Sequence, residues 1–445
     1  MTFLLCGSTL TASAAGGDSE GSELDNIKEL LNAISYNEYM KEYTSKGELA
    51  KEEDGDDSTN PNYFDLVPNA GSEIVLDGLD GVYVNNLGDV LEYDPAEALK
   101  PGDAAPKEEK PYKFSDGEKE GLMVPDTGTV TWTIAADDAN AIKLPTRYSL
   151  SIEYYPIANK SASIERVFMI NDEVPFAEAR YLTISKVWST PYPDATIKVE
   201  KGMTVADLIA EAKAAGFTEA KEVQDKNGDA CVAISFPEKW TEASTKFVND
   251  YTVRYFTADT DKNEIRESLV QSPAWNTYIF KDSNGFVQTP FEFVIAPDEE
   301  GKVTLTLEGV NEPIVISELR LTPCESYRSY EDYREQYSGY GKGGDIIKIE
   351  AEYFNASSNQ TIYPISDTTS AANSPSATDR TLLNAVGGEK WQNVGQWIEY
   401  NFTVSKSGNY SIVTRYKQNI LDGMATSRIL CLYSDETVAE GEDGY

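Results

Sequence analysis

The chain has 445 residues, 40% of them hydrophobic, so it is long enough for two or three domains with sizeable cores. Its net charge of −37 at pH 7 excludes nucleic acid and anionic membrane surfaces as ordinary partners, because like charges repel. It contains no histidine, which excludes Ser-His-Asp and Cys-His hydrolases and histidine-ligated metals within this stretch.

The first residues have the pattern of an export signal. A short apolar run at residues 3–5 is followed by Ala12-Ser13-Ala14, which is typical of a signal-peptidase site. We therefore predict a signal peptide at residues 1–15 and an extracellular or cell-surface location. A lipid anchor on Cys6 is the alternative, although the residue before it is bulky. No other run is long and apolar enough to span a bilayer.

Residues 16–71 are predicted to form a leader helix and an acidic linker. Tyr36, Tyr39 and Tyr43 recur at three- and four-residue spacings, which places them on one helix face. The stretch from residue 48 to residue 63 is acidic and contains Asn60-Pro61-Asn62, which indicates a solvated linker.

Residues 72–323 are predicted to form a first β-sandwich module. Alternating apolar and polar residues at 128–134, 148–155, 163–170 and 314–321 are typical of strands with one buried face. Within this module, residues 190–257 have the mixed pattern of an α+β insertion. Thr204 is a candidate N-cap for a helix at 205–215, with Gly216 at its end, and a further strand is expected at 247–256.

Part of this unit occurs twice in the chain. Residues 148–173 return at 410–436, and Ser35–Tyr43 returns at Ser329–Tyr337. We therefore predict a second leader helix and linker at 324–344 and a second β-sandwich module at 345–445. This second copy ends without counterparts of the closing strands, so we expect it to be incomplete, with a C-terminal continuation missing. A naturally shorter second unit is the alternative.

The second copy carries three phrases in a characteristic order. Glu350-Ala351-Glu352 opens it, Gly395-Gln396-Trp397-Ile398-Glu399-Tyr400 follows, and Gly408-Asn409-Tyr410 comes last. This order resembles carbohydrate-binding modules of families 6 and 35, which are β-jelly-rolls. The resemblance implies a mainly β chain made of two jelly-roll β-sandwich modules in tandem, each preceded by a short helix.

The resemblance also implies ligands. In that family the opening glutamates help to hold a structural calcium ion, which points to Glu350 and Glu352 here; hard oxygen ligands suit calcium. The alternative is two solvated carboxylates. Sugar binding requires an aromatic platform with polar neighbours. The candidates in loops are Trp391 with Gln392 and Asn393, and in the first module Trp275 and Trp188. Trp397 alternates with Glu399 in a strand pattern, which favours a core position.

These features predict a non-catalytic function. We expect recognition of a polysaccharide or oligosaccharide by tandem modules of a secreted bacterial surface protein, the N-terminal part of a solute-binding protein of a sugar ABC transporter. A permease would then bind through the missing C-terminal part. A catalytic domain in that missing part is a further alternative. The alternatives are structural or adhesive spacer modules that bind no sugar, and accessory modules of a polysaccharide-degrading enzyme.

Overall fold

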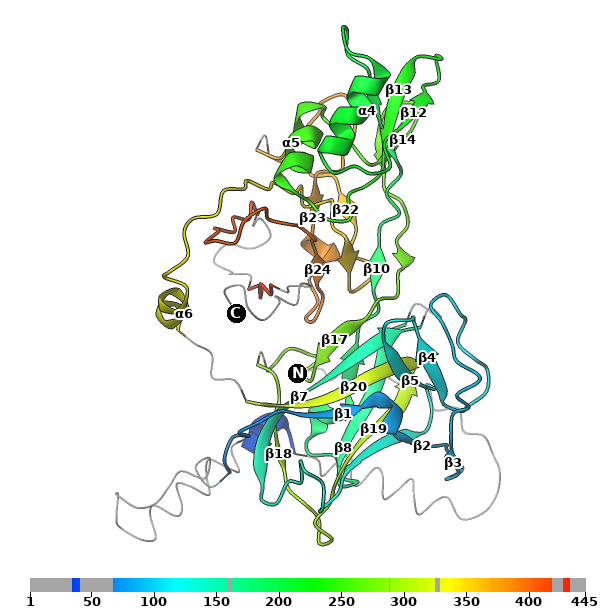
Figure 1. The fold of residues 1–445 in the computed structure, drawn as a ribbon, viewed down its shortest axis with the longest axis vertical. Coiled ribbons are helices and arrows are strands. Elements are labelled where there is room, and N and C mark those ends of the chain that lie inside the picture. Colours follow the sequence, from blue (N-terminus) through cyan, green and yellow to red (C-terminus); the bar gives the residue numbers. More distant parts are fainter. Residues whose placement is uncertain are drawn as a thin grey trace, which may run out of the picture.

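The computed structural model describes residues 34–40, 67–157, 162–287, 289–324, 329–370, 372–417 and 427–432. The expected signal peptide at 1–15, with Cys6, and most of the linker at 16–71 lie outside these residues. The described chain is mainly β, as predicted, and its sheets are antiparallel (Figure 1). Within the described ranges, no helix combines the length and the apolar character that crossing a membrane requires.

Two sheets form a β-sandwich, the lower part of Figure 1. The larger sheet has the order β17-β7-β20-β5-β4, with β1 beside β20 and β18 beside β7. Its strands are β1 (Ile74–Asp77), β4 (Tyr112–Ser115), β5 (Glu120–Val124), β7 (Thr146–Pro156), β17 (Asn276–Ile279), β18 (Glu292–Ile295) and β20 (Ile314–Pro323). The smaller sheet has the order β3-β2-β6-β19-β8-β9, with β2 (Val82–Val84), β3 (Val90–Leu91), β6 (Thr129–Ile134), β8 (Ile164–Ile170), β9 (Leu182–Ile184) and β19 (Val303–Asn311).

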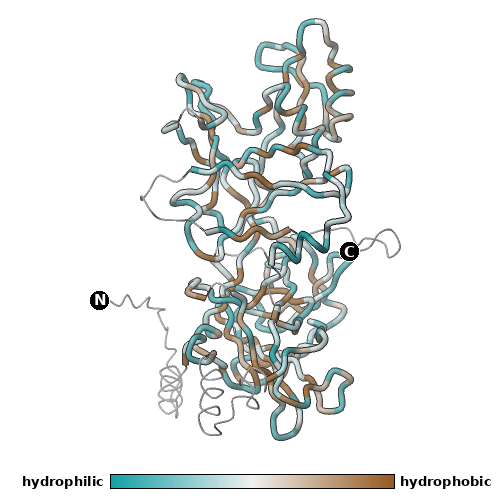
Figure 2. The backbone as a smooth tube through the Cα atoms, turned by 90° about the vertical axis from the view of Figure 1, so that its left-hand side faces the viewer, coloured by the Kyte–Doolittle hydropathy of each residue, from teal (hydrophilic) through white to brown (hydrophobic). Residues whose placement is uncertain are grey.

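The core lies between these sheets and follows from side-chain alternation. Ile152 and Tyr154 of β7 are buried in it, whereas Tyr155 belongs to a separate cluster on the other face of the same sheet. Trp132, in the centre of β6, is buried as its alternating run predicts, and its indole Nε1 donates to the Asp77 carbonyl at 2.9 Å. Figure 2 shows apolar segments in both the lower and the upper part of the molecule.

The insertion at residues 190–257 forms a small α+β lobe at the top of Figure 1. Its sheet has the order β11-β13-β12, with β11 (Ala195–Lys198), β12 (Lys221–Gln224) and β13 (Ala230–Ile234), next to α4 (Val205–Ala214) and α5 (Glu242–Asp250). Thr204 caps α4 through a reciprocal pair of hydrogen bonds with Asp207, and Gly216 follows the C-cap with a φ of +97°.

One expectation for the lobe is wrong. The sequence predicts a strand at 247–256, but most of that stretch belongs to α5 or to the turn after it. Thr241 and Ser244 form a reciprocal capping box that starts the helix, and Phe247 and Val248 turn toward the lobe core. The apolar residues that begin this stretch therefore follow the period of a helix and not that of a strand.

The second copy of the repeat, residues 345–445 and called the second repeat below, does not form a sandwich within the described residues. It contains only the two-residue strands β21 (Ala356–Ser357), β22 (Pro364–Ile365), β23 (Ala385–Val386) and β24 (Ile398–Glu399), together with η3 (Gly388–Lys390). Residues 410–416 repeat the strand pattern of 148–155, but no strand is present at 410–416 in this structure. In the first copy, β7 is held by β17, β18 and β20, and the corresponding residues 410–416 have no such neighbours in the described part of the chain.

The second repeat packs on the insertion lobe instead. Tyr353 and Leu383 are buried within the lobe core, and Ile347 and Ile349 pack against it. The backbone of Trp240 exchanges hydrogen bonds with Asn401 and Thr403. β21 also pairs with β10 (Trp188–Ser189), which in turn pairs with β16 (Val270–Gln271), so the second repeat lies against the two chain segments that connect sandwich and lobe.

Candidate functional site

An aromatic cluster lies on the outer face of the seven-stranded sheet. Tyr154 points into the sandwich core, so Tyr155, the next residue of β7, points away from it. Phe114 of β4 lies beside Tyr155, with ring centroids 4.7 Å apart. Trp275, directly before β17, meets both rings edge to face, at 5.8 Å from Phe114 and 5.5 Å from Tyr155.

Charged groups surround the half-buried Trp275. Its indole Nε1 donates to Asp116 Oδ2 at 2.6 Å, and Lys119 Nζ lies 5.5 Å from the ring centroid. Backbone N–H groups of Lys119 and Glu118, together with the indole N–H, lower the pKa of Asp116 below its usual value, so this carboxylate is ionised at neutral pH. Lys119 also pairs with Glu153 of β7.

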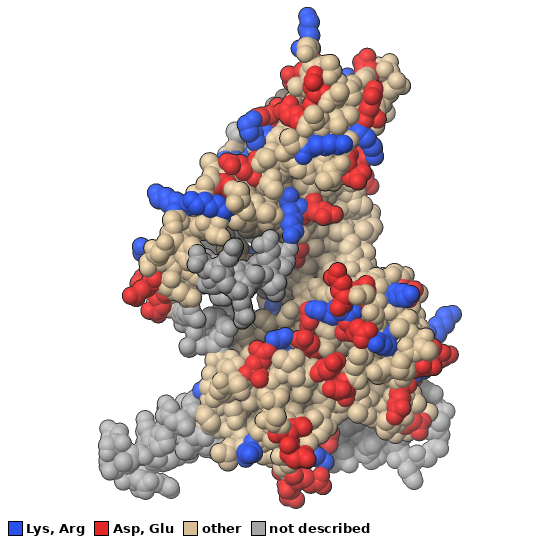
Figure 3. All heavy atoms as spheres, viewed as in Figure 1, with Lys and Arg blue, Asp and Glu red and all other residues tan. Residues whose placement is uncertain are grey.

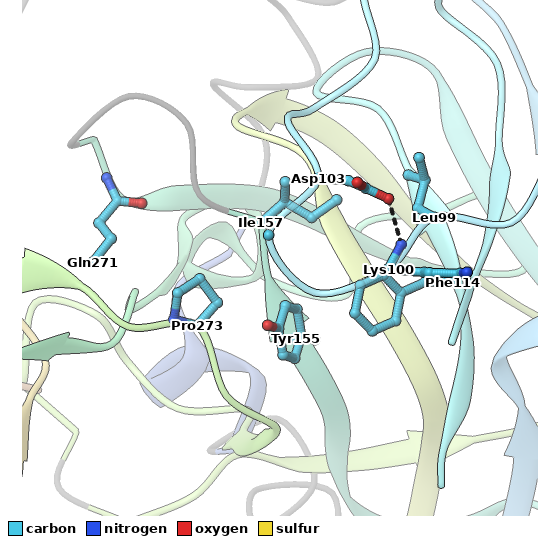
Figure 4. A pocket seen from close by; sticks show the side chains of 9 residues that line it. Leu99, Lys100, Asp103, Phe114, Tyr155, Ile157, Gln271 and Pro273 are labelled. Atoms are coloured by element: carbon cyan, nitrogen blue, oxygen red, sulfur yellow. Dashed lines mark hydrogen bonds between the residues drawn. The ribbon is translucent and has the colours of Figure 1, made fainter. Parts of the chain in front are cut away.

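A pocket of about 190 Å³ opens beside this cluster (Figure 4). Phe114, Tyr155 and Ile157 supply apolar walls, and Asp103 and Gln271 supply polar groups. The remaining lining residues are Leu99, Lys100, Gly102 and Pro273. The Lys100 N–H donates to Asp103 Oδ2 at 2.7 Å, which fixes the turn of the loop that borders the pocket.

This arrangement suits a small ring-shaped ligand with an apolar face and polar edges. Sites for drug-sized ligands have volumes of about 300–1,000 Å³, so this smaller pocket has room for roughly one ring. Aromatic side chains contact the faces of such a ring, while carboxylates and amides bind its hydroxyl groups.

Trp391 lies on a different element from this cluster. It follows η3 and is half-buried, with Nε1 donating to the Gln396 carbonyl at 3.1 Å. The guanidinium of Arg428 lies 4.7 Å from the centroid of its ring. Gln392 and Asn393 are exposed beside it, and the Asn393 N–H donates to Gln396 Oε1 at 2.9 Å. The polar side chains expected beside Trp391 are therefore present, and the guanidinium of Arg428 stacks on its indole.

Trp188 lies in a strand and not in a loop. It belongs to β10, between β16 and β21, and exposes only 6% of its surface. In this structure it offers no ring face to a sugar. Trp275, in contrast, contacts Phe114 and Tyr155, two residues that line the pocket described above.

The two candidate calcium ligands have different environments. Glu350 pairs with Lys348 at 2.5 Å, whereas Glu352 is fully buried and its Oε1 lies 3.0 Å from a guanidinium nitrogen of Arg254. Arg254 also binds both carboxylate oxygens of Glu264 at 2.8 Å. Among the described residues, no group of three or more His, Cys, Asp or Glu side chains is placed to hold a metal ion. Calcium binding stays a prediction.

Sequence reasoning found Trp275 but missed its partners. Phe114, Asp116 and Tyr155 are far from residue 275 in the chain, and only sheet pairing brings them together. One local signal could have indicated Tyr155, because the consecutive pair Tyr154-Tyr155 must place one ring on each face of a strand.

The fold and the site define a mainly β protein with an aromatic pocket on the face of a sandwich sheet. In comparisons with known proteins, no family model, no curated protein and no solved structure matches this chain. The resemblance to carbohydrate-binding modules therefore rests on the phrases between residues 350 and 410.

Proposed function

We propose that the protein binds a carbohydrate, without catalysis, through the sandwich face at Trp275. The observation that supports this is the half-buried Trp275 itself, held by Asp116 at the margin of a pocket walled by Phe114 and Tyr155. A sugar ring stacks its C–H face on such aromatics and presents hydroxyl groups to nearby carboxylates and amides.

The broader context is part of the same proposal. The export signal expected at residues 1–15 and the acidic composition suit a secreted or surface-bound bacterial protein, and the family resemblance suits a jelly-roll sandwich. Attachment to a sugar transporter as its solute-binding protein, with a permease as partner, is the biological setting that we favour. Spacer modules without ligand remain the rival.

The test is titration of the full chain with a panel of soluble polysaccharides and oligosaccharides, followed by Trp275→Ala. By analogy with bases stacked on aromatic side chains, we expect a loss of about 1–3 kcal/mol in binding, or roughly five- to 150-fold in affinity. Because Trp275 is only half-buried, we expect the melting temperature of the Trp275→Ala variant to differ little from that of the unaltered protein.

The matched control is Trp391→Ala, which removes the other candidate platform. If Trp391→Ala weakens binding and Trp275→Ala does not, the site lies in the second repeat and our assignment is wrong. If no member of the panel binds, the result supports the rival function, a structural spacer that binds no sugar.

A further inference from the structure

The two leader helices of the repeat have the same local design. Ser35 Oγ accepts the Glu38 N–H at 3.2 Å, and the Ser35 N–H donates to the Glu38 carboxylate at 2.9 Å. Ser329 and Asp332 make the same reciprocal pair, at 3.1 Å and 3.3 Å, at the start of α6 (Tyr330–Gln336). In both copies a tyrosine follows the capping serine directly and another comes three residues later.

The first helix closes an open sheet edge. Tyr36 and Tyr39 expose only 5% and 7% of their surface. The Glu292 N–H donates to the Tyr36 hydroxyl at 3.0 Å, and the Val294 N–H donates to the Tyr39 hydroxyl at 2.9 Å. Both N–H groups belong to β18, whose only strand partner in the described part of the chain is β7. The two tyrosines thus satisfy the outward N–H groups of an edge strand.

The geometry of the two elements explains why this spacing works. On a strand, N–H groups two residues apart point to the same side, about 6.8 Å from each other. On a helix, residues three apart lie on one face. Two tyrosines at that spacing can therefore reach two successive outward N–H groups, and an uncovered edge would invite pairing with other chains.

Further contacts define what this helix recognises. The Tyr36 ring lies 4.9 Å from Phe176 and 4.7 Å from Phe291, and the Tyr36 N–H donates to a Glu178 carboxylate oxygen at 2.7 Å. The acceptor surface therefore combines an edge strand, aromatic side chains beside it, and a carboxylate at the helix start.

The second helix presents the corresponding tyrosines largely to solvent, where Arg334 lies 5.7 Å from the Tyr330 ring and Tyr337 lies 4.8 Å from the Tyr333 ring. Tyr330 and Tyr333 of α6 correspond to Tyr36 and Tyr39, yet they expose 69% and 52% of their surface. Figure 1 shows α6 standing apart from the sandwich and the lobe. The same side chains are thus buried on a sheet edge in one copy and exposed in the other.

We propose that α6 is a second edge-capping helix, whose partner is a protein edge strand of the β18 kind. That strand presents two outward N–H groups two residues apart, with aromatic side chains beside it. The acidic residues Glu331, Asp332 and Glu335 of α6 outnumber its single Arg334, which disfavours an anionic membrane surface as the partner.

The experiment asks whether the α6 sequence can cap a known edge. In the full chain, Asn37→Glu, Glu38→Asp, Lys41→Glu and Glu42→Gln bring the sequence Ser35–Tyr43 to that of Ser329–Tyr337 at every position except Met40, which is kept because it packs against the core. Amide hydrogen exchange at Glu292 and Val294 is the readout. We expect protection within about threefold of that of the unaltered chain.

Two further variants make the result decisive. Adding Tyr36→Ala and Tyr39→Ala to the grafted chain should speed exchange at both amides by about tenfold or more. A milder graft, with Asn37→Glu and Glu38→Asp alone, changes only exposed residues and serves if the larger graft does not fold. Loss of protection at Glu292 and Val294 in a folded grafted chain would overturn the proposal, as would protection that survives removal of both tyrosines.

Discussion

At residue scale, Glu352 is a buried carboxylate that shares one cation with a second carboxylate. Arg254 binds Glu264 through two hydrogen bonds and reaches Glu352 with its remaining nitrogen. Burial raises the pKa of Glu352 from its ordinary value of 4.5 to about 7, and the nearby Arg254 only partly offsets this. The charged form of Glu352 therefore destabilises the contact between the second repeat and the lobe.

The raised pKa of Glu352 determines how the stability of the protein depends on pH. The folded protein binds the Glu352 proton more tightly than the unfolded chain does, so the stability that this group contributes is fully present below pH 4.5 and is lost as the pH rises to about 7. Glu352→Gln keeps an acceptor for Arg254 and removes the charge. We expect it to raise the free energy of unfolding by roughly 3 kcal/mol at about pH 8, and to change it little at about pH 4.

Chemical denaturation of the variant and the unaltered chain at both pH values checks this. Taking the difference between the two proteins cancels the titration of the other acidic residues. An equal effect at both pH values would show that Glu352 does not titrate in this range.

At the scale of elements, the second repeat shows that tertiary neighbours determine which structure a repeated sequence adopts. Tyr353 follows the Glu350-Ala351-Glu352 phrase but lies inside the lobe, with ring centroids 5.6 Å from Tyr255 and 5.5 Å from Phe256. Its hydroxyl accepts the Tyr255 N–H at 3.2 Å. The second repeat thus completes a core that the insertion begins.

Tyr353→Ala should therefore destabilise the lobe. Truncating a large buried aromatic costs about 3–5 kcal/mol, because a cavity remains where the ring was. Limited proteolysis should then cut residues 346–402 more readily, and the thermal transition should shift downward. Tyr330→Ala, in the exposed helix α6, is the control and should change stability by no more than about 0.5 kcal/mol. Equal effects of the two changes would contradict this packing.

At the scale of the whole molecule, charge is the dominant feature. The chain has 75 acidic and 38 basic residues. On the face seen in Figure 3, acidic and basic side chains are interspersed and not sorted into one basic patch. Local ion pairs at the surface contribute little, so the long-range repulsion of a net −37 remains.

Added salt should therefore stabilise the protein. The screening length falls from about 30 Å at 0.01 M to about 10 Å at 0.1 M ionic strength, which shortens the range of this repulsion. We expect the melting temperature to rise over that interval and then to level off. Differential scanning calorimetry across a sodium chloride series measures it, and a melting temperature that falls with salt would mean that attractive pairs dominate.

The sequence alone determined the features that depend on neighbours in the chain. Alternation predicted β6, β7 and β8, the Thr204 cap predicted the start of α4, and the repeat predicted equivalent helices at residues 36 and 330. These features follow from period and capping, which involve residues a few positions apart. The same local reading failed at α5, where an apolar run fitted both a strand and a helix.

Only the tertiary structure decided which of these pieces meet. Trp275 joins Asp116 across 159 residues because β7 and β17 pair beside β20, and Tyr36 becomes buried because β18 is an open edge. Residues 410–416 carry a strand pattern, yet no strand in the described part of the chain pairs with them, and a strand is stable only when neighbouring strands and a buried face complete it. Pairing across such distances depends on partners that no local pattern specifies.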